Sequence, residues 1–443
     1  MNEDAGRRIS SNLSKMVRLK TVSHFAAAET DEAEFVKFRQ LLDDLYPLTA
    51  EAGQRRLIGR TGLLYRIPGK SAEKACVFMA HYDVVPAEES EWDFDPFSGE
   101  MKDGFICGRG SLDTKCTLCS VMEAVEEKLR EGWIPAHDLY LSFSGEEEVE
   151  GEDADAIVKD FEARKVYPDF VLDEGGAVIP EGLPGVKRPA AMIGIAEKGV
   201  ANLELSVQNA GGHASTPPKS TAVGELSRAA VAIETHPFPA QLTKPVLEMF
   251  RYLGTEVPGI YGAAFRHAGL LSPAIRAAAA KMGGTFNAMV RTTCAVTMMQ
   301  GSSSFNVLPD RAVMGVNLRL LGSDTMESAL AHIRKTVNDP KIEYRYISGS
   351  NPSPVSDCEG EKWKQLTGVV RHFWPEALPA PYTLNGGTDS RHFHRISGCV
   401  YKFTPMEMSA AERGTVHGRN EKIAAARLLK MTEFYGKLME ELL

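Results

Sequence analysis

The sequence predicts an α/β protein whose mostly parallel mixed sheet is interrupted by a separate α+β domain. From residue 62 to residue 172, short apolar runs alternate with helix-like segments, which is typical of βαβ units. Near residue 198 the pattern changes to strands of alternating apolar and polar residues, and from residue 349 the first pattern returns. Because 443 residues exceed what one hydrophobic core usually organises, we expect two domains.

The first part, residues 1–197, is expected to supply most of the parallel sheet. Apolar runs of strand length are separated by segments of helical periodicity. Ligand crevices in such sheets form at the carboxyl ends of the strands, so polar residues that follow these runs are functional candidates. The expected elements are helices at 7–19, 31–45, 113–130 and 153–164 and strands at 62–67, 75–80, 138–144 and 169–172.

The middle part, residues 198–348, is predicted to form a small α+β domain with a four-stranded antiparallel sheet, because strand and helix patterns repeat in it. Residues 238–290 are rich in Ala, Gly and Met and are expected to form an inserted helical segment. A segment of Ser, Asn and Pro residues at 348–355 is expected to link this domain back to the first one. Residues 349–443 then complete the first domain. The expected elements are strands at 200–208, 312–320 and 341–347 and helices at 221–235 and 325–337.

The composition is that of an ordinary globular protein, with 43% hydrophobic and 25% charged residues. A formal charge of −9 argues against nucleic acid or an anionic membrane as the main partner. No apolar leader is visible at the N-terminus, and no apolar run reaches the roughly 18 residues that a membrane span needs. Seven scattered cysteines favour reduced thiols and a cytoplasmic setting.

The most informative segment is the apolar run 76–80, which leads into His81, Tyr82 and Asp83. Side chains two apart on a strand point the same way. Asp83 can therefore accept the Nδ1 proton of His81 and leave Nε2 free for a metal. A single His-x-Asp is common by chance, so the interpretation depends on further ligands elsewhere.

Further carboxylates follow the helix and strand patterns. Asp113 opens a helix, where it can bridge two cations or act only as a helix cap. Glu146, Glu147 and Glu148 follow the strand 138–144, either as a solvated acidic loop or as a metal ligand beside a general base. Asp173 ends the next strand before two glycines.

His417 lies in a glycine-containing loop before the last helix and, taken alone, could be a surface histidine. It is the joint occurrence of these oxygen and nitrogen donors, without cysteine, that indicates a catalytic site for zinc, cobalt or manganese. The Cys116-x-x-Cys119 spacing has no second pair to complete a structural zinc site, so buried helical thiols are the preferred interpretation.

Seven motifs in this order resemble the M20 metallopeptidases, closest to the branch of carboxypeptidase S and the N-acyl-amino-acid amidohydrolases. They are HYDVVP (81–86), GRGSLDTK (108–115), EEEVEG (146–151), LDEGG (172–176), GGHAST (211–216), NGGTDSRHF (385–393) and HGRNE (417–421). The resemblance covers nearly the whole chain. It implies a zinc-peptidase-like α/β catalytic domain interrupted by a ferredoxin-like lid domain.

The resemblance also implies a role for each candidate in a site for two Zn²⁺, with Co²⁺ or Mn²⁺ as alternatives. Glu147 is the implied general base, and Asp83 is the implied partner of His81. The implied metal ligands are His81, Asp113 as the bridge, Glu148, Asp173 and His417.

Two points of the family pattern stay open. Gly151 favours Glu147 and Glu148 as the base and ligand pair, but anchoring on Gly145 would shift the pair to Glu146 and Glu147. Thr114 stands where the family usually has a second acid after the bridging Asp, which leaves the role of that acid in doubt.

Lid and substrate residues are implied in the same way. His213 resembles a lid histidine that reaches a neighbouring active site, commonly across a dimer, and we therefore expect a homodimer through the lid domain. Arg319 could hold a substrate carboxylate bidentately or could be a solvated strand-face residue. The implied substrate-binding residues are Asn306, Arg319, Gly387 and Thr388.

We expect an amide or peptide-bond hydrolase that acts on a small peptide or an N-acyl amino acid with a free carboxylate. Carboxypeptidase, dipeptidase and N-acyl-amino-acid deacylase or synthase activities all fit this pattern. The rival interpretation is a catalytically silent binding protein on the same fold. It would be indicated by loss of the base or the bridging ligand, and both are present in this sequence.

Overall fold

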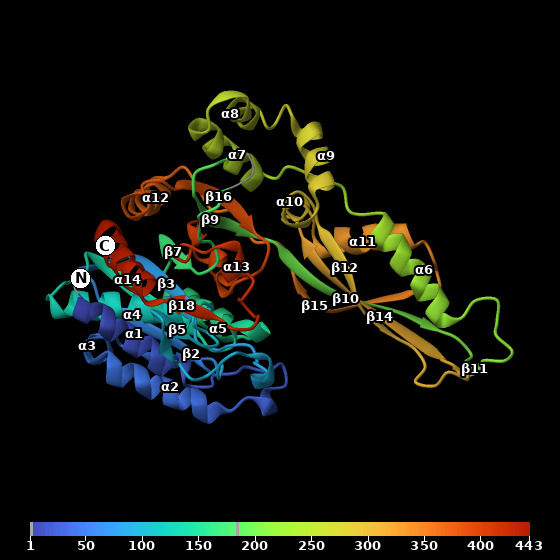
Figure 1. Ribbon diagram of the computed structural model, residues 1–443, viewed down its shortest axis with the longest axis horizontal. Helices are drawn as coiled ribbons and strands as arrows, with labels where there is room; N and C mark the ends of the chain where they lie inside the picture. The colour runs from blue at the N-terminus through green and yellow to red at the C-terminus, as the bar shows by residue number, and fades with distance from the viewer. Residues whose placement is uncertain (1–2, 183–185) are drawn as a thin grey trace. The chain divides into compact units, whose positions relative to one another are not determined.

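The computed structural model describes residues 3–182 and 186–443, and the chain divides into two compact units (Figure 1). The first comprises the described residues of Met1–Ile195 with Ser356–Pro381 and Thr388–Leu443. The second comprises Ala196–Val355 and Tyr382–Gly387. The lid domain was expected over 198–348, so the second unit extends beyond the expected range at both ends. It also includes the short segment 382–387, for which the sequence carries no recognisable signal.

A mixed sheet forms the centre of the first unit, with the order β1-β2-β6-β3-β7-β17-β9-β16 and β8 paired to β9 among the described residues. The pairs β3–β6, β3–β7 and β7–β17 at the centre of the sheet are parallel, and the pairs β1–β2, β2–β6 and β9–β17 are antiparallel. The expected mixed α/β sheet is therefore confirmed, with its parallel strands at the centre. Its strands are β1 (Arg56–Ile58), β2 (Gly62–Ile67), β3 (Ser71–His81), β6 (His137–Ser144), β7 (Phe170–Asp173), β8 (Val178–Ile179), β9 (Ala190–Glu197), β16 (Leu378–Leu384) and β17 (Val400–Lys402).

Helices cover both faces of this sheet, as its doubly buried strands require. On one face Val77 packs in a core with Ile157 and Phe161 of α5. On the other face the ring of Phe78 lies 5.7 Å from that of Tyr435 in α14. The helices are α1 (Glu3–Val17), α2 (Glu32–Leu45), α3 (Pro47–Ala52), α4 (Lys115–Arg130), α5 (Asp153–Arg164), α12 (Glu361–Phe373), α13 (Ala410–Arg413) and α14 (Ala425–Leu442).

Short elements join these layers. A small sheet of order β18-β5-β4 is formed by β4 (Met101–Lys102), β5 (Phe105–Cys107) and β18 (Lys422–Ala424). It brings the segment after residue 421 beside the segment before residue 108. The short 3₁₀ helices are η1 (Ala27–Glu29), η2 (Glu89–Glu91), η3 (Glu147–Val149) and η4 (Asp389–Arg395).

The second unit contains a four-stranded antiparallel sheet with the order β12-β14-β10-β15. Alternate residues of its strands pack against α6 and α11 in one apolar core. The helical segment expected at 238–290 corresponds to α7–α10. The elements are β10 (Gly199–Gln208), β11 (Gly212–His213), α6 (Ala222–Thr235), α7 (Lys244–Glu256), α8 (Gly259–Arg266), α9 (Ser272–Met282), α10 (Gly284–Met289), β12 (Thr293–Gln300), β13 (Val307–Leu308), β14 (Arg311–Leu320), α11 (Met326–Val337) and β15 (Glu343–Ser350).

Several short strands and three longer ones, β9, β12 and β16, were not expected from the sequence. In β9 every residue is buried, and small residues interrupt the apolar run, so no alternation marks it. β16 contains Pro379 and Pro381 and lies last in the strand order, a place where proline is tolerated. β12 is an edge strand that is mostly exposed or half-buried. None of the helices in the described part of the chain is long and apolar enough to cross a membrane.

Candidate metal centre

Three adjacent strands of the first unit end next to one another and bring acidic and imidazole side chains together. β3 ends at His81, which pairs with Ser144 at the end of β6. On the other side of β3 lies β7, which ends at Asp173. Because these strands are parallel, the residues that follow them collect at one edge of the sheet.

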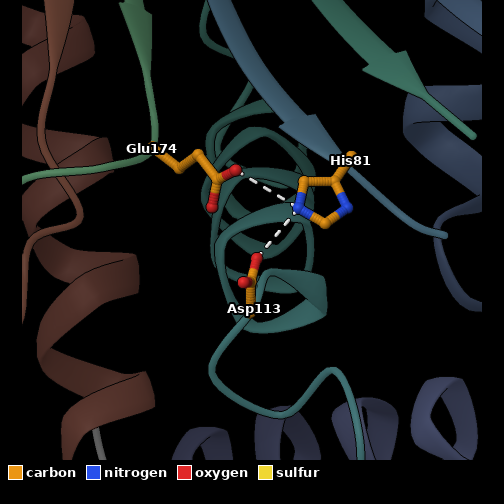
Figure 2. Close-up of side chains that lie close together, drawn as sticks. All are labelled: His81, Asp113 and Glu174. Carbon is orange, nitrogen blue, oxygen red and sulfur yellow. Dashed lines mark hydrogen bonds and ion pairs between the residues drawn. The ribbon is translucent and has the colours of Figure 1, made fainter. Parts of the chain in front are cut away.

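The first group of potential ligands, here called the strand-rooted group, consists of His81, Asp113 and Glu174. Nε2 of His81 lies 2.9 Å from Oδ1 of Asp113 and 3.2 Å from Oε1 of Glu174. Figure 2 shows the three side chains pointing toward one another, with His81 at the end of its strand. The His81 side chain is only 1% exposed. This group therefore lies on a buried part of the scaffold.

The second group, here called the loop-rooted group, consists of Asp113, Glu148 and His417. Nε2 of His417 lies 2.9 Å from Oε2 of Glu148 and 3.1 Å from Oδ2 of Asp113. The His417 side chain is 53% exposed, and its backbone has a φ of 57° in the left-handed region. Its three members come from loops and from η3 rather than from strands.

Asp113 belongs to both groups, one oxygen to each. Its Oδ1 faces His81 and its Oδ2 faces His417. Burial opposes the charge on this carboxylate, but the hydrogen bonds from His417 and His81 outweigh it and lower the pKa of Asp113. A carboxylate held ionised between two imidazoles has the arrangement needed to bridge two cations.

Asp83 lies behind both His81 and the glutamate loop. Its Oδ1 is 3.3 Å from Nδ1 of His81, whose nearest Nδ1 contact is the Asp83 carbonyl oxygen at 3.0 Å. The same carboxylate accepts the backbone N–H groups of Glu147 at 3.2 Å and Glu148 at 3.1 Å. The hydroxyl of Ser23 donates to it at 2.7 Å. Asp83 therefore does more than orient one ring, since it also fixes the loop that carries Glu147 and Glu148.

The structure places Glu174, and not the expected Asp173, in the strand-rooted group. The Asp173 carboxylate accepts N–H groups of Glu174 at 2.9 Å and Ser390 at 3.1 Å, and Asp173 belongs to neither ligand group among the described residues. Neighbouring side chains on an extended backbone point to opposite sides, so only one of the two carboxylates can turn toward His81. Asp173, the residue expected from the sequence, thus lies outside the group that Glu174 joins.

The run of three glutamates separates in the same way. Oε1 of Glu146 accepts a hydrogen bond from Arg60 at 2.9 Å and lies apart from both groups. Oε2 of Glu147 lies 4.0 Å from Nε2 of His81 without joining a ligand group. Glu148 is the member that reaches His417. The arrangement matches the register in which Glu147 and Glu148 are the functional pair.

The carboxylates crowd one another strongly. Burial raises the pKa of Glu147 well above its ordinary value, and Glu174, Asp389 and Glu148 add to the shift against the opposing charge of His81. Burial likewise raises the pKa of Glu174 to about 7, against His81 and with Asp113 adding to the rise. So many acids in one buried place are costly unless protons or cations neutralise them.

Both histidines hold their protons tightly in this environment. Burial opposes the charge on His81, but Glu174, Asp113 and Asp83 raise its pKa well above the ordinary value. Hydrogen bonds from the imidazole to Asp113 and Glu148 raise the pKa of His417 to about 10. Any metal that binds here displaces those protons.

The donor set fits divalent transition metals. Each group combines one imidazole with two carboxylates, a set that suits catalytic rather than structural zinc. Oε1 of Glu148 is buried and has no hydrogen-bond partner among the described residues, an arrangement that a bound cation would satisfy.

The residues predicted to bind substrate are divided between the units. In the second unit His213 pairs with Val307 in the β11–β13 ribbon, and the N–H of Ala214 donates to the Asn306 carbonyl at 3.0 Å. The structure thus brings His213 and Asn306 close together. Arg319 lies on β14 opposite Val200, on the side of the sheet away from the buried core residues.

Gly387 and Thr388 lie at the boundary of two chain segments, Gly387 in the second unit and Thr388 in the first. The Thr388 hydroxyl caps η4 by accepting the N–H of Ser390 at 3.3 Å. Asp389 follows, buried, with one carboxylate oxygen that lacks a hydrogen-bond partner among the described residues. The Thr388 side chain therefore stabilises the start of η4.

Two functional candidates were missed from the sequence, Glu174 and Glu421. Glu174 directly follows Asp173, the ligand expected from the sequence, and only the direction of the two side chains in the structure distinguishes them. Glu421 closes the HGRNE motif and is fully buried, a burial that charge alone does not predict. Cys116 and Cys119 are buried free thiols on α4, as expected.

Comparison with protein families identifies the chain. The model of peptidase family M20/M25/M40 matches residues 77–441. The probable carboxypeptidase S-like 2 of Dictyostelium discoideum is 30% identical over 98% of this chain and 84% of its own length. The N-fatty-acyl-amino acid synthase/hydrolase PM20D1 of Homo sapiens is 30% identical over 96% of this chain and 86% of its own length.

Solved structures share the fold. The M20 family metallo-carboxypeptidase Sso-CP2 from Sulfolobus solfataricus superimposes with a TM-score of 0.73 at 17% identity, covering 99% of both chains. The dipeptidase Dug1p from Saccharomyces cerevisiae gives 0.68 at 15% identity, covering 99% of this chain and 97% of its own. The chain is an enzyme that belongs to peptidase family M20/M25/M40.

Proposed function

We propose that the protein is a dinuclear metal-dependent hydrolase of amide or peptide bonds. Its substrates are peptides or N-acyl amino acids with a free carboxylate. The observation that carries the proposal is the position of Asp113. Its two carboxylate oxygens lie 2.9 Å from Nε2 of His81 and 3.1 Å from Nε2 of His417. That geometry is the one expected of a carboxylate that bridges two metal ions.

His81 and Glu174 would hold one ion, Glu148 and His417 the other, and Asp113 both. Glu174 replaces Asp173 in this proposal because Glu174 is the residue that faces His81. Zn²⁺ is the proposed metal, with Co²⁺ or Mn²⁺ as alternatives, since imidazole and carboxylate donors suit all three. When bound, such ions polarise a scissile carbonyl and acidify water.

Glu147 is the proposed general base. It adjoins the ligand Glu148 but stays out of both ligand groups, so its carboxylate is available for proton transfer. Its surroundings raise its pKa, which suits a group that takes a proton from water and delivers it to the leaving amine. Asp83 fixes the backbone of Glu147 and so fixes the direction of the base.

Arg319 is the proposed partner of the substrate carboxylate. Register places Lys198 on the same face of the sheet, because Val200 lies opposite Arg319 and Lys198 is two residues before Val200. Burial, and after it the nearby charge of Arg319, lowers the pKa of Lys198 to about 8, so a second cationic side chain lies near Arg319. Asn306, Gly387 and Thr388 are proposed to hold the rest of the substrate.

His213 is proposed to polarise the scissile carbonyl, with a homodimer through the second unit bringing it to the neighbouring active site. His213 is exposed in its own chain, and its ring nitrogen Nδ1 lies 2.8 Å from the Ser215 hydroxyl, which leaves Nε2 for another partner. A fully active protein that sediments only as a monomer would contradict this arrangement.

A cytoplasmic setting is also part of the proposal, supported by seven free cysteines among the described residues.

Two substrate classes are compatible with the proposed function. Carboxypeptidase or dipeptidase activity is supported by the carboxypeptidase S-like relative. Hydrolysis of N-acyl amino acids is supported by the relative named as an N-fatty-acyl-amino acid synthase/hydrolase. Both reactions need the same metal centre and the same carboxylate partner, so they differ in the pocket for the acyl side.

A hydrolysis screen of the zinc- or cobalt-loaded protein tests this proposal. The panel contains dipeptides, longer peptides with free C-termini, and N-acyl amino acids, each with a C-terminally amidated control. Glu147→Gln should retain both metals and lose about 10²- to 10⁴-fold in kcat. Wild-type turnover in the metal-loaded variant would refute the base assignment. No hydrolysis and no bound metal in the wild type would support a silent binding protein instead.

A further inference from the structure

The loop-rooted group joins two segments that are far apart in the sequence. Asp113 lies just before α4, and His417 lies just before β18. Glu421 connects the two segments. Its Oε1 accepts the backbone N–H groups of Leu112 at 2.7 Å and Asp113 at 3.1 Å. The side chain is 0% exposed, so these two bonds are made without competition from water.

Arg109, which lies on the same segment as Asp113, also connects the two segments by donating to the 417–421 loop. One terminal nitrogen of its guanidinium donates to Oε2 of Glu421 at 2.8 Å, and the other donates to the carbonyl of Gly418 at 2.9 Å. Gly418 directly follows His417. Arg109 is 3% exposed, and its guanidinium lies over the ring of Trp92 at 5.1 Å. The forked geometry of arginine therefore holds both ends of the 417–421 loop to the loop that carries Asp113.

This loop needs external support because of its backbone. His417 and Asn420 have φ values of 57° and 60°, in the left-handed region that side-chain-bearing residues seldom occupy. Such conformations persist only where neighbouring contacts fix them. Asn420 pairs with Asp93 through two hydrogen bonds of 2.8 Å, and the Gly108 N–H donates to the Glu421 carbonyl at 2.9 Å.

We propose that Arg109 and Glu421 are positioning residues that clamp the bridging Asp113 and His417 in the geometry that binds the metals. The inference rests on the proposed dinuclear function. The clamp touches no member of the strand-rooted group except Asp113, and it touches the His417 segment directly. Its loss should therefore weaken the ion at Glu148 and His417 more than the ion at His81 and Glu174.

Two variants test the clamp. Glu421→Gln keeps the size of the side chain but removes its charge, and an amide cannot satisfy Arg109 and both backbone N–H groups together. Arg109→Lys keeps the charge but loses the fork that reaches both Glu421 and Gly418. Groups that orient metal ligands typically contribute 10- to 100-fold in metal affinity, so we expect losses of about that size.

Glu126→Gln is a matched control. Glu126 is also a buried glutamate, 3% exposed, that accepts two neighbouring backbone N–H groups, from Leu48 at 3.1 Å and Thr49 at 2.8 Å. It lies on α4 and holds α3, with no contact to a ligand group. The control should lower thermal stability while leaving metal affinity unchanged.

The readout is equilibrium competition of Zn²⁺ against a chromophoric chelator, with the absorption spectrum of the Co²⁺-loaded protein as a second signal. His417→Ala identifies the binding step that belongs to the loop-rooted group. The expected result is a 10- to 100-fold loss in that step for Glu421→Gln and Arg109→Lys, an altered Co²⁺ spectrum and a smaller change in the other step.

Wild-type affinities and an unchanged Co²⁺ spectrum in either variant that folds would overturn the clamp. Equal metal losses in Glu126→Gln would overturn it too, because they would show a general effect of stability. If Glu421→Gln fails to fold, Arg109→Lys decides alone. A wild-type protein that binds no metal would refute the proposed function itself, which is a separate outcome.

Discussion

The strand-rooted and loop-rooted groups offer the same donors, one imidazole and two carboxylates, on very different supports. His81 is the last residue of a strand inside the sheet and is 1% exposed. His417 is 53% exposed and lies on a loop with left-handed backbone. In one group the sheet fixes the ligands, and in the other a set of buried hydrogen bonds does so.

Two buried carboxylates support the loops that carry these ligands. Asp83 accepts the N–H groups of Glu147 and Glu148, and Glu421 accepts those of Leu112 and Asp113. In both cases a buried anion holds a ligand-bearing loop through two consecutive backbone N–H groups. The metal affinity of the centre therefore depends on these supporting groups as well as on the ligands themselves.

The largest effect is expected at the residue that the two groups share. Asp113→Asn should weaken both ions by more than about 100-fold and reduce hydrolysis to the background rate, because one side chain serves both. His81→Ala and His417→Ala should each empty only one site. Metal content after dialysis, measured by elemental analysis, checks this. Retention of two ions in Asp113→Asn would show that the groups are independent.

The next effect distinguishes the two neighbouring acids of the strand-rooted group. Glu174→Gln should remove one ion, because Glu174 faces His81. Asp173→Asn should retain both ions and lower only the stability, because its carboxylate accepts N–H groups of Glu174 and Ser390. Zinc titrations and thermal unfolding of both variants measure the contrast. Loss of metal in Asp173→Asn alone would restore the role expected from sequence.

A smaller effect is expected at Asp83, which supports both groups. In Asp83→Asn an amide would face the groups that now donate hydrogen bonds to the carboxylate. Metal affinity should therefore fall about 10- to 100-fold. Ser23→Ala is the control, since it removes only the hydroxyl that donates to Asp83 at 2.7 Å. Equal affinities in Asp83→Asn and Ser23→Ala would contradict the supporting role.

The smallest effect concerns pH in the metal-free protein. The pKa of His417 is raised to about 10, so its pairing stabilises the fold fully below its unfolded pKa of about 6.5. That stabilisation is lost as the pH rises through about 10. Because His417 is half-exposed, the unfolding temperatures of chelator-treated wild type and His417→Ala should differ by only about 1–2 °C at pH 6. A difference that is the same at pH 6 and pH 10.5 would contradict this pairing.

Much of this architecture could be predicted from the sequence, because hydrophobic periodicity reports burial. The run before His81 and the alternation of β14 were visible in that way. The choice between Asp173 and Glu174 was not visible, since it depends on which side chain the end of β7 turns toward His81. Glu421 was missed because its partners at Leu112 and Asp113 lie some three hundred residues away. Periodicity carries no information on such long-range hydrogen bonds.

Anomalous diffraction at the zinc edge, from crystals grown with Zn²⁺, is the most direct test of whether Asp113 bridges two metal ions. We expect two anomalous peaks, one on either side of Asp113. One should lie about 2.0–2.2 Å from donor atoms of His81 and Glu174, and the other at that distance from donor atoms of His417 and Glu148. A single peak, or a peak coordinated by Asp173 in place of Glu174, would contradict it.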